Sequence, residues 1–240
     1  MKTVTCFFLL ALIAAGCGSQ NEEKSETTDT TIQSQAADEQ LFTDAARNLV
    51  AQYGNELQTT LFAALNDYGP SYGVRVCQTR AQEIAAAHSV GDWIVKRVSE
   101  KWRTIEDRPD TAEQRVLAVF ADPMTADDYL VRWSGPDSAR MFHYYQKILV
   151  RQVCLQCHGD LQTVDLDLWK EVKIAYPWDK ATGYKEGDLR GMFVVNAPYP
   201  QGQEIARLLA DGATVAELAP PADSAAVDST LTDTVLEDTL

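Results

Sequence analysis

The feature that most constrains this chain is the segment Cys154-Leu155-Gln156-Cys157-His158. Two cysteines that are separated by two residues and followed by a histidine are the signature of covalent haem attachment. Each thiol adds across one vinyl group of the haem, so both sulfurs must reach one edge of the ring from a single helical turn. The next residue, His158, then faces the iron and can serve as its proximal ligand. The segment therefore predicts one covalent haem c.

The same cysteine pair has three alternative uses, which are a redox dithiol, a structural disulfide and half of a zinc site. A zinc site would need two more Cys or His ligands at paired spacing. Apart from Cys77, the chain after residue 17 offers only His88 and His143, which are far apart in the sequence. A thioredoxin-like dithiol needs a strand followed by a helix and does not require the histidine. Haem attachment is therefore the preferred interpretation.

The N-terminus has the pattern of a secretory signal peptide over residues 1–16. Its apolar run from Phe7 to Ala15 is too short to span a bilayer, because a transmembrane helix needs about 20 apolar residues. The run ends in Ala14-Ala15-Gly16-Cys17, which resembles the lipobox of bacterial lipoproteins and implies lipidation of Cys17. The alternative is an ordinary signal peptide with an incidental cysteine. We expect an exported lipoprotein, anchored to a membrane on the periplasmic side or at the cell surface.

Most of the net charge of −14 lies in two polar segments near the ends of the chain. Residues 18–40 carry −5 and residues 211–240 carry −7, which leaves −3 between them. Such segments bury too little apolar surface to offset the entropy lost on ordering. We therefore expect a flexible lipid-anchored tether at 17–38, a disordered acidic tail at 211–240 and one folded domain at 39–210. No basic patch stands out, so nucleic acid is not an expected partner.

Hydrophobic periodicity within the folded domain predicts helices first and strands later. A long amphipathic helix is expected over residues 38–67 and a second helix over 72–88. A short helix is expected over 111–121, with Thr111 as its N-cap. Strands are expected at four places, namely residues 92–99, 129–133, 141–150 and 190–196. This order predicts an α+β fold with an antiparallel sheet, flanking helices and a long N-terminal helix.

Cys77 is the one free thiol that remains after the other cysteines are assigned. Cys6 leaves with the signal peptide, Cys17 takes lipid, and Cys154 and Cys157 take haem. Free thiols are unusual in an oxidising compartment. On the apolar face of the second helix, this cysteine would fit a small buried core residue or a distal ligand of the haem iron. The competing distal ligands are Met124, Met141, Met192, His88 and His143.

Several segments together resemble a family of exported c-type haem domains with a PAS-like fold. The resemblance covers residues 40–198 and is carried by residues 154–159, 176–184 and 187–195, and upstream by Cys77 and Arg97-Val98-Ser99. It implies a central antiparallel sheet with flanking helices and a haem clamped against the sheet. It also implies an iron held by His158 on one side and by Cys77 on the other.

The function that follows is electron transfer or other redox chemistry with an unknown redox protein, because an iron with two protein ligands leaves no site open for a substrate. The alternative is a haem-based sensor of redox state or of NO or CO, which would signal through a separate partner. We expect a carrier or a sensor rather than an enzyme, since only His88 and His143 could serve as acid–base groups near neutral pH. Partly buried haem propionates need cationic partners, and the candidates are Arg97, Arg103 and Arg190.

Overall fold

The computed structural model describes residues 20–219 of the 240-residue chain. The expected signal peptide, Cys17 and the expected tail beyond residue 219 lie outside the described residues. The chain divides into two units, one that ends at Gln40 and one that begins at Leu41. Among residues 20–219, no helix combines the length and apolar character needed to span a membrane.

The first two helices are α1 (Gln20–Tyr68) and α2 (Pro70–Ala87). Both were expected, but α1 begins at Gln20 rather than at residue 38, so residues 20–38 are helical where an irregular tether was expected. Extending a helix adds one hydrogen bond for each residue ordered, whereas starting one is costly. A polar segment rich in Glu, Gln, Thr and Ser can therefore continue the helix that packs further along the chain, although only Glu and Gln of these favour helix.

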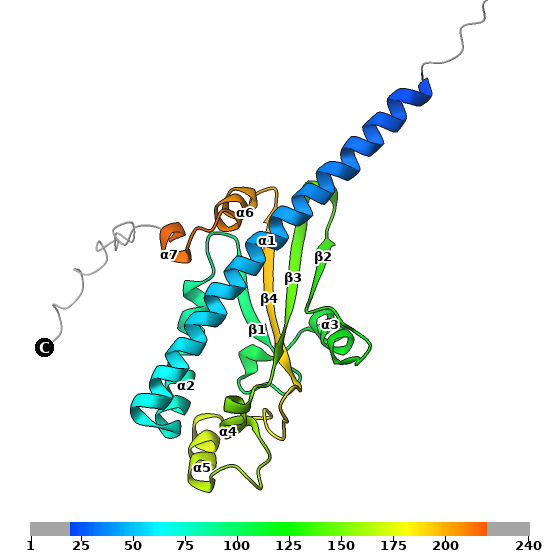
Figure 1. The fold of residues 1–240 in the computed structure, drawn as a ribbon. Coiled ribbons are helices and arrows are strands. Elements are labelled where there is room, and N and C mark those ends of the chain that lie inside the picture. Colours follow the sequence, from blue (N-terminus) through cyan, green and yellow to red (C-terminus); the bar gives the residue numbers. More distant parts are fainter. Residues whose placement is uncertain (1–19, 220–240) are drawn as a thin grey trace, which may run out of the picture. The chain divides into compact units, whose positions relative to one another are not determined.

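A four-stranded antiparallel sheet forms the centre of the unit from Leu41 onward, in the order β1-β4-β3-β2 (Figure 1). Its strands are β1 (Ile94–Val98), β2 (Tyr129–Ser134), β3 (Arg140–Leu149) and β4 (Leu189–Tyr199). All four lie where the sequence analysis predicts strands, within three residues at each end. The α+β, PAS-like class with an antiparallel sheet, flanking helices and a long N-terminal helix is therefore confirmed.

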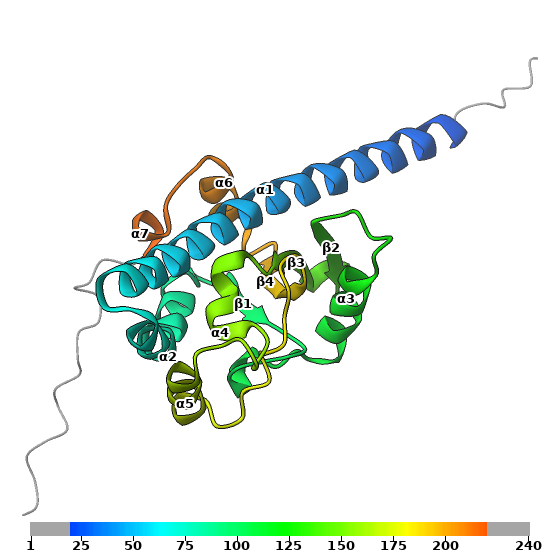
Figure 2. The same cartoon turned by 60° about the horizontal axis from the view of Figure 1, so that its bottom comes forward.

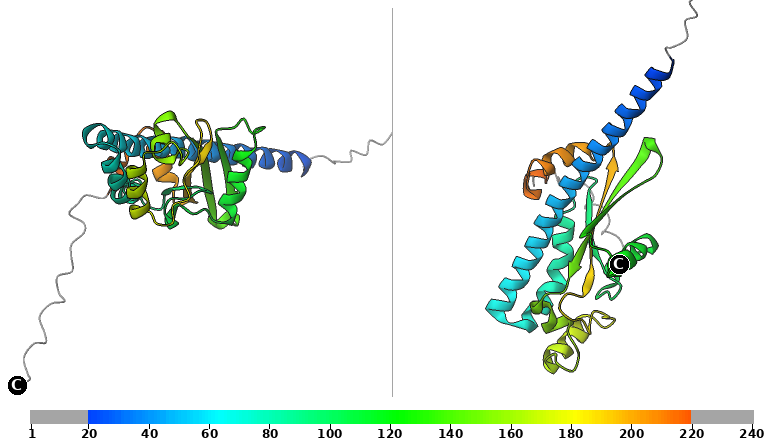
Figure 3. Two further views of the ribbon diagram at one scale, coloured as in Figure 1. Left: turned by 90° about the horizontal axis from the view of Figure 1, so that it is seen from below. Right: turned by 45° about the vertical axis from the view of Figure 1, so that its right-hand side comes forward.

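Both faces of the sheet are covered by helices, as Figure 3 shows. The part of α1 from Leu41 onward packs on one face, where Phe42, Trp93 and Phe142 are fully buried. Helix α3 (Thr111–Ala121) covers the other face, and its Leu117 packs in a second cluster of buried residues. The bounds of α3 agree with the sequence prediction, but its N-cap is Asp110 rather than Thr111. Asp110 is the N-cap because its side chain and that of Glu113 form a reciprocal capping box.

Three helices lie close together at one end of the sheet, namely α2, α4 (Leu155–His158) and α5 (Leu166–Ala175) (Figure 2). Helix α5 was not predicted from the sequence. The connections also contain three short 3-10 helices, η1 (Ile105–Asp107), η2 (Asp137–Ala139) and η3 (Gln152–Cys154). The crossing of α2 and α5 buries Val74 against Leu168 and Val172.

The folded domain continues past residue 210, where the acidic tail was expected to begin. Helices α6 (Gln203–Ala210) and α7 (Val215–Leu218) follow β4. Val215 is buried in the main core, and the side-chain amide of Gln52 on α1 donates to the carbonyl of Ala213 at 3.0 Å. The tail prediction is therefore wrong for residues 211–219, because a few apolar residues were enough to dock this acidic segment on α1.

The aromatic cluster under α1 gives a direct test of this packing. Phe42 is fully buried, with ring centroids 5.3 Å from those of both Trp93 and Phe142. We expect Phe42→Ala to lower the free energy of unfolding by about 3–5 kcal/mol, because the change removes buried apolar contacts and leaves a cavity. Chemical denaturation would measure it, with Ile174→Ala on α5 as the control because Ile174 is 80% exposed. A loss no larger than that of the control would contradict the packing described.

Candidate functional site

The cysteine pair lies on a tight turn that follows β3. Cys154 ends η3, and Cys157 and His158 lie in the single turn of α4. Gly159 ends this turn, where a β-carbon would lie 2.5 Å from the carbonyl oxygen of Leu155, so only glycine fits. Both cysteines are free thiols and are half-buried. The turn therefore presents two sulfurs and an imidazole within five residues.

The turn forms one wall of a cavity of about 730 Å³, a volume within the range of cofactor sites. Apolar side chains of α1, such as Leu57 and Leu61, form a second wall, and α2 contributes Val74 and Cys77. The sheet closes the cavity through residues of β1 and β4, among them Phe193. The candidate residues Cys77, Cys154, Cys157, His158, Arg97, Arg103 and Arg190 all line this one cavity.

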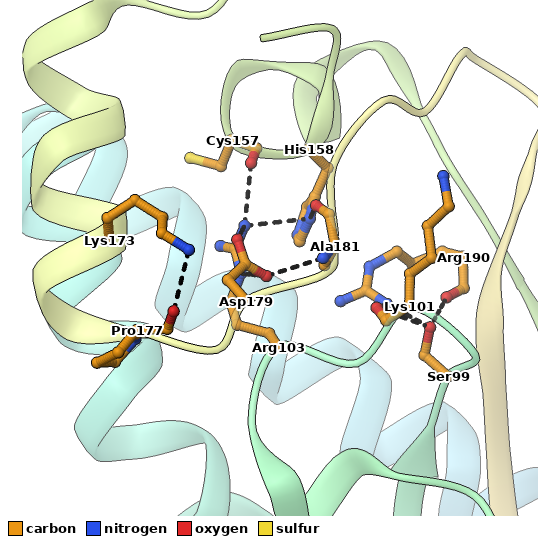
Figure 4. A network of polar contacts seen from close by, with 10 residues as sticks. All are labelled: Ser99, Lys101, Arg103, Cys157, His158, Lys173, Pro177, Asp179, Ala181 and Arg190. Carbon is orange, nitrogen blue, oxygen red and sulfur yellow. Dashed lines mark hydrogen bonds and ion pairs between the residues drawn. The ribbon is translucent and has the colours of Figure 1, made fainter.

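The imidazole of His158 is held in one tautomer by a backbone carbonyl. Its Nδ1 lies 2.7 Å from the carbonyl oxygen of Ala181 (Figure 4). Because a carbonyl oxygen can only accept, Nδ1 must carry the proton, which leaves the lone pair of Nε2 available for a metal. Burial, together with the nearby Arg103 and Arg190, lowers the pKa of His158 well below its usual value. The ring is therefore neutral at neutral pH, as a metal ligand must be.

Asp179 is a residue of the site that the sequence analysis did not identify. Its side chain is completely buried and forms an ion pair with Arg103, whose Nε lies 3.3 Å from Asp179 Oδ1. The same oxygen accepts a hydrogen bond from the amide of Ala181 at 2.9 Å. The sequence around Asp179 reads as an ordinary turn and gives no sign that this carboxylate is buried. The ion pair with Arg103 is therefore recognised only from the three-dimensional packing.

The other two arginines of the cavity have different surroundings. Arg190 donates through Nη1 to the hydroxyl of Ser99 at 2.8 Å and to the carbonyl of Lys101 at 3.3 Å (Figure 4). Arg97 on β1 interacts with the hydroxyl of Tyr53. Its Nε is buried and has no hydrogen-bond partner. An unpartnered buried N–H of a cation beside a cavity suits a negatively charged or polar ligand group.

Cys77 reaches the cavity from α2. Burial raises the pKa of this thiol, and the nearby Arg97 and Arg103 oppose the rise. Without a metal, Cys77 is therefore a neutral thiol. Among the described residues that line the cavity, none is a competing distal ligand named from the sequence, whether Met124, Met141, Met192, His88 or His143.

The two remaining histidines do not line the cavity and have polar contacts at other places in the fold. His88 is buried at the end of α2, where its Nδ1 lies 2.9 Å from the carbonyl of Ile84. His143 lies on β3 between Ser134 and Asn196, with both ring nitrogens 2.7 Å from oxygens of these side chains. Within residues 20–219, no three His, Cys, Asp or Glu side chains gather as a metal site, so the zinc interpretation gains no support.

Comparison with known proteins places the chain in a family. The model of the Tll0287-like family, described as Tll0287, matches residues 20–198. A solved crystal structure, that of the cyanobacterial heme-protein Tll0287, is 25% identical and gives a TM-score of 0.45 over 75% of this chain and 98% of that one. No curated protein matches the chain significantly. Because the family model covers well over half of the sequence, the chain belongs to the Tll0287-like family.

Proposed function

We propose that this chain is an exported, lipid-anchored c-type haem protein that carries one covalent haem and takes part in electron transfer. The proposal rests on one observation, which is that Cys154, Cys157 and His158 line a single cavity while His158 Nδ1 is committed to a backbone carbonyl. The family shares its name with Tll0287, which is described as a cyanobacterial heme-protein.

The residues that line the cavity fit a covalently attached haem. The thiols of Cys154 and Cys157 would each add across a vinyl group, with sulfur bonding to one vinyl carbon and hydrogen to the other. The His158 Nε2 lone pair would hold the iron, and the unpartnered Nε of Arg97 would donate to a propionate. Arg190, held by Ser99, would add a second cation. A haem held here would supply a reversible one-electron iron couple.

Cys77 is our proposed distal ligand. Coordination to ferric iron stabilises a thiolate and lowers the thiol pKa, which would overcome the effect of burial at this position. The ligand would also protect from oxidation the one cysteine of the mature chain that has no other assignment. If His158 and Cys77 both held the iron, no position would be left for a substrate, which would suit outer-sphere electron transfer better than catalysis.

A second candidate function is a haem-based sensor of redox state or of NO or CO, acting through a separate partner protein. The observation that favours it is the burial of Cys77, which raises its pKa. Because burial disfavours a thiolate here, Cys77 would hold a reduced iron less firmly than an oxidised one, and a gas would then compete with it for the iron. Reversible redox cycling without CO binding would support the carrier, whereas tight CO binding to the reduced protein would support the sensor.

The location of the protein is part of the same proposal. The signal-peptide pattern at residues 1–16 and the lipobox-like Cys17 support export and attachment to a membrane on the periplasmic side or at the cell surface. Thioether formation at Cys-X-X-Cys-His segments belongs to the same compartment. The expected partners are the membrane, through the lipid, and a redox or signalling protein.

The covalent link is tested by replacing both thiols. We expect Cys154→Ser combined with Cys157→Ser to abolish covalent haem, because no sulfur remains for the thioether bonds. Intact mass spectrometry and haem staining after denaturing electrophoresis would measure attachment. Cys77→Ser is the matched control and should keep the haem bound. Extraction of haem from the wild-type protein into acidic organic solvent would contradict covalent attachment.

The distal ligand is tested by Cys77→Ala. We expect loss of the low-spin ferric signature of thiolate ligation in electron paramagnetic resonance. We also expect a higher reduction potential, because thiolate donation favours ferric iron. Met124→Ala is the control, since Met124 was a competing ligand and is 88% exposed. An unchanged ferric spectrum in Cys77→Ala would show that Cys77 is only a core residue.

The anchor is tested by Cys17→Ser. We expect this variant to leave the membrane fraction, because each buried CH₂ of a lipid chain contributes about 0.8 kcal/mol and only two or more chains hold stably. Fractionation and mass spectrometry of the N-terminal peptide would measure the change, with Cys77→Ser as a control that keeps its lipid. A Cys17→Ser protein that stays with the membranes would contradict the lipoprotein assignment.

A further inference from the structure

We propose that the Arg103–Asp179 ion pair positions His158 and sets the reduction potential of the iron through its two opposite charges. This inference rests on the proposed haem site and deepens it, because it assigns a role to residues that do not themselves hold the iron. Arg103 was expected only as a contact of a haem propionate, and Asp179 was not expected in the site.

The first set of contacts links Arg103 to His158 through residues of the loop after α5 (Figure 4). Arg103 Nε and Nη2 each lie 3.3 Å from one carboxylate oxygen of Asp179. Asp179 Oδ1 accepts from the amide of Ala181 at 2.9 Å, and the carbonyl of Ala181 accepts from His158 Nδ1 at 2.7 Å. The ion pair therefore fixes the residue that selects the imidazole tautomer and the direction of its ring.

The second set of contacts joins Arg103 directly to the turn that contains Cys157 and His158. Its Nη2 donates to the carbonyl oxygen of Cys157 at 3.0 Å. The same nitrogen lies 3.3 Å from His158 Nδ1. That approach is not a hydrogen bond, because both nitrogens carry hydrogen and neither can accept. It instead places a full positive charge beside the ring of the proximal ligand.

Because Arg103 and Asp179 are buried, their charges can act strongly on the reduction potential of a nearby iron. The side chain of Arg103 is 10% exposed and that of Asp179 is 0% exposed, so solvent and salt screen them weakly. A positive charge near the iron disfavours the ferric form, which carries one more positive charge than the ferrous form, and a negative charge favours it. Arg103 should therefore raise the potential and Asp179 should lower it. A purely structural role would give no such opposition of signs.

The test is a spectroelectrochemical titration of the holoprotein and its variants. We expect Arg103→Gln to lower the reduction potential and Asp179→Asn to raise it. The asparagine keeps an oxygen that can accept from Ala181, so this change isolates the charge. The double variant should return toward the wild-type value. Lys170→Gln is the control, because it removes an exposed positive charge from α5 and should not shift the potential.

Shifts of both single variants in the same direction, or no shift in either, would overturn the inference. Removing one member of a buried ion pair often destabilises a protein, while replacing both is tolerated better. If Arg103→Gln does not fold, Arg103→Lys takes its place, because it keeps the positive charge and should keep the wild-type reduction potential. A lysine variant whose reduction potential is clearly shifted from that of the wild type would contradict the electrostatic role.

Experiments on the haem-free protein can test the positioning role of the ion pair even if the proposed haem binding is wrong. A wild-type chain that never takes up haem would overturn the proposed function. The positioning role would then be read from ¹⁵N NMR of the His158 ring. We expect a single Nδ1–H tautomer in the wild type and a mixture of tautomers in Asp179→Ala. An unchanged single tautomer in that variant would show that the pair does not position His158.

Discussion

The hydrogen bond from His158 Nδ1 to the carbonyl of Ala181 joins the two segments that orient the imidazole. One segment is the cysteine turn after β3, and the other is the loop after α5. Two backbone hydrogen bonds run beside it, from Gly183 to Gly159 and from Tyr184 to His158. The bond determines which ring nitrogen is free, so the chemistry of the cavity follows from how this loop is held.

A cavity of this size is tolerated because the sheet is supported without it. The cluster around Phe42 supports one face and the cluster around Leu117 supports the other, and of their buried residues only Ile84 and Val98 also line the cavity. The space at the end of the sheet can therefore stay open between α1, α2 and the turn. Its walls combine an apolar surface with the three arginines Arg97, Arg103 and Arg190, a lining that suits a flat apolar ring with acidic side groups.

The sequence predicts α2, α3 and the four strands, and it singles out residues that the structure brings to one cavity, because both depend on local patterns. Alternating or continuous apolar residues locate the four strands, and the spacing of Cys154, Cys157 and His158 indicates their joint role. The sequence does not predict the partners of these residues across the fold. Nothing local in the sequence reveals that Asp179 is buried against Arg103, or that a nominally acidic segment docks through Val215. Those outcomes depend on contacts between segments far apart in the chain.

We have proposed that one cavity holds a haem whose iron is bound by His158 and Cys77. X-ray absorption at the iron K-edge of the ferric holoprotein tests it most directly, because the fine structure separates sulfur from nitrogen ligands. We expect a single sulfur ligand, from the thiolate of Cys77, with nitrogens completing the coordination. A ferric centre ligated by nitrogen alone would contradict it.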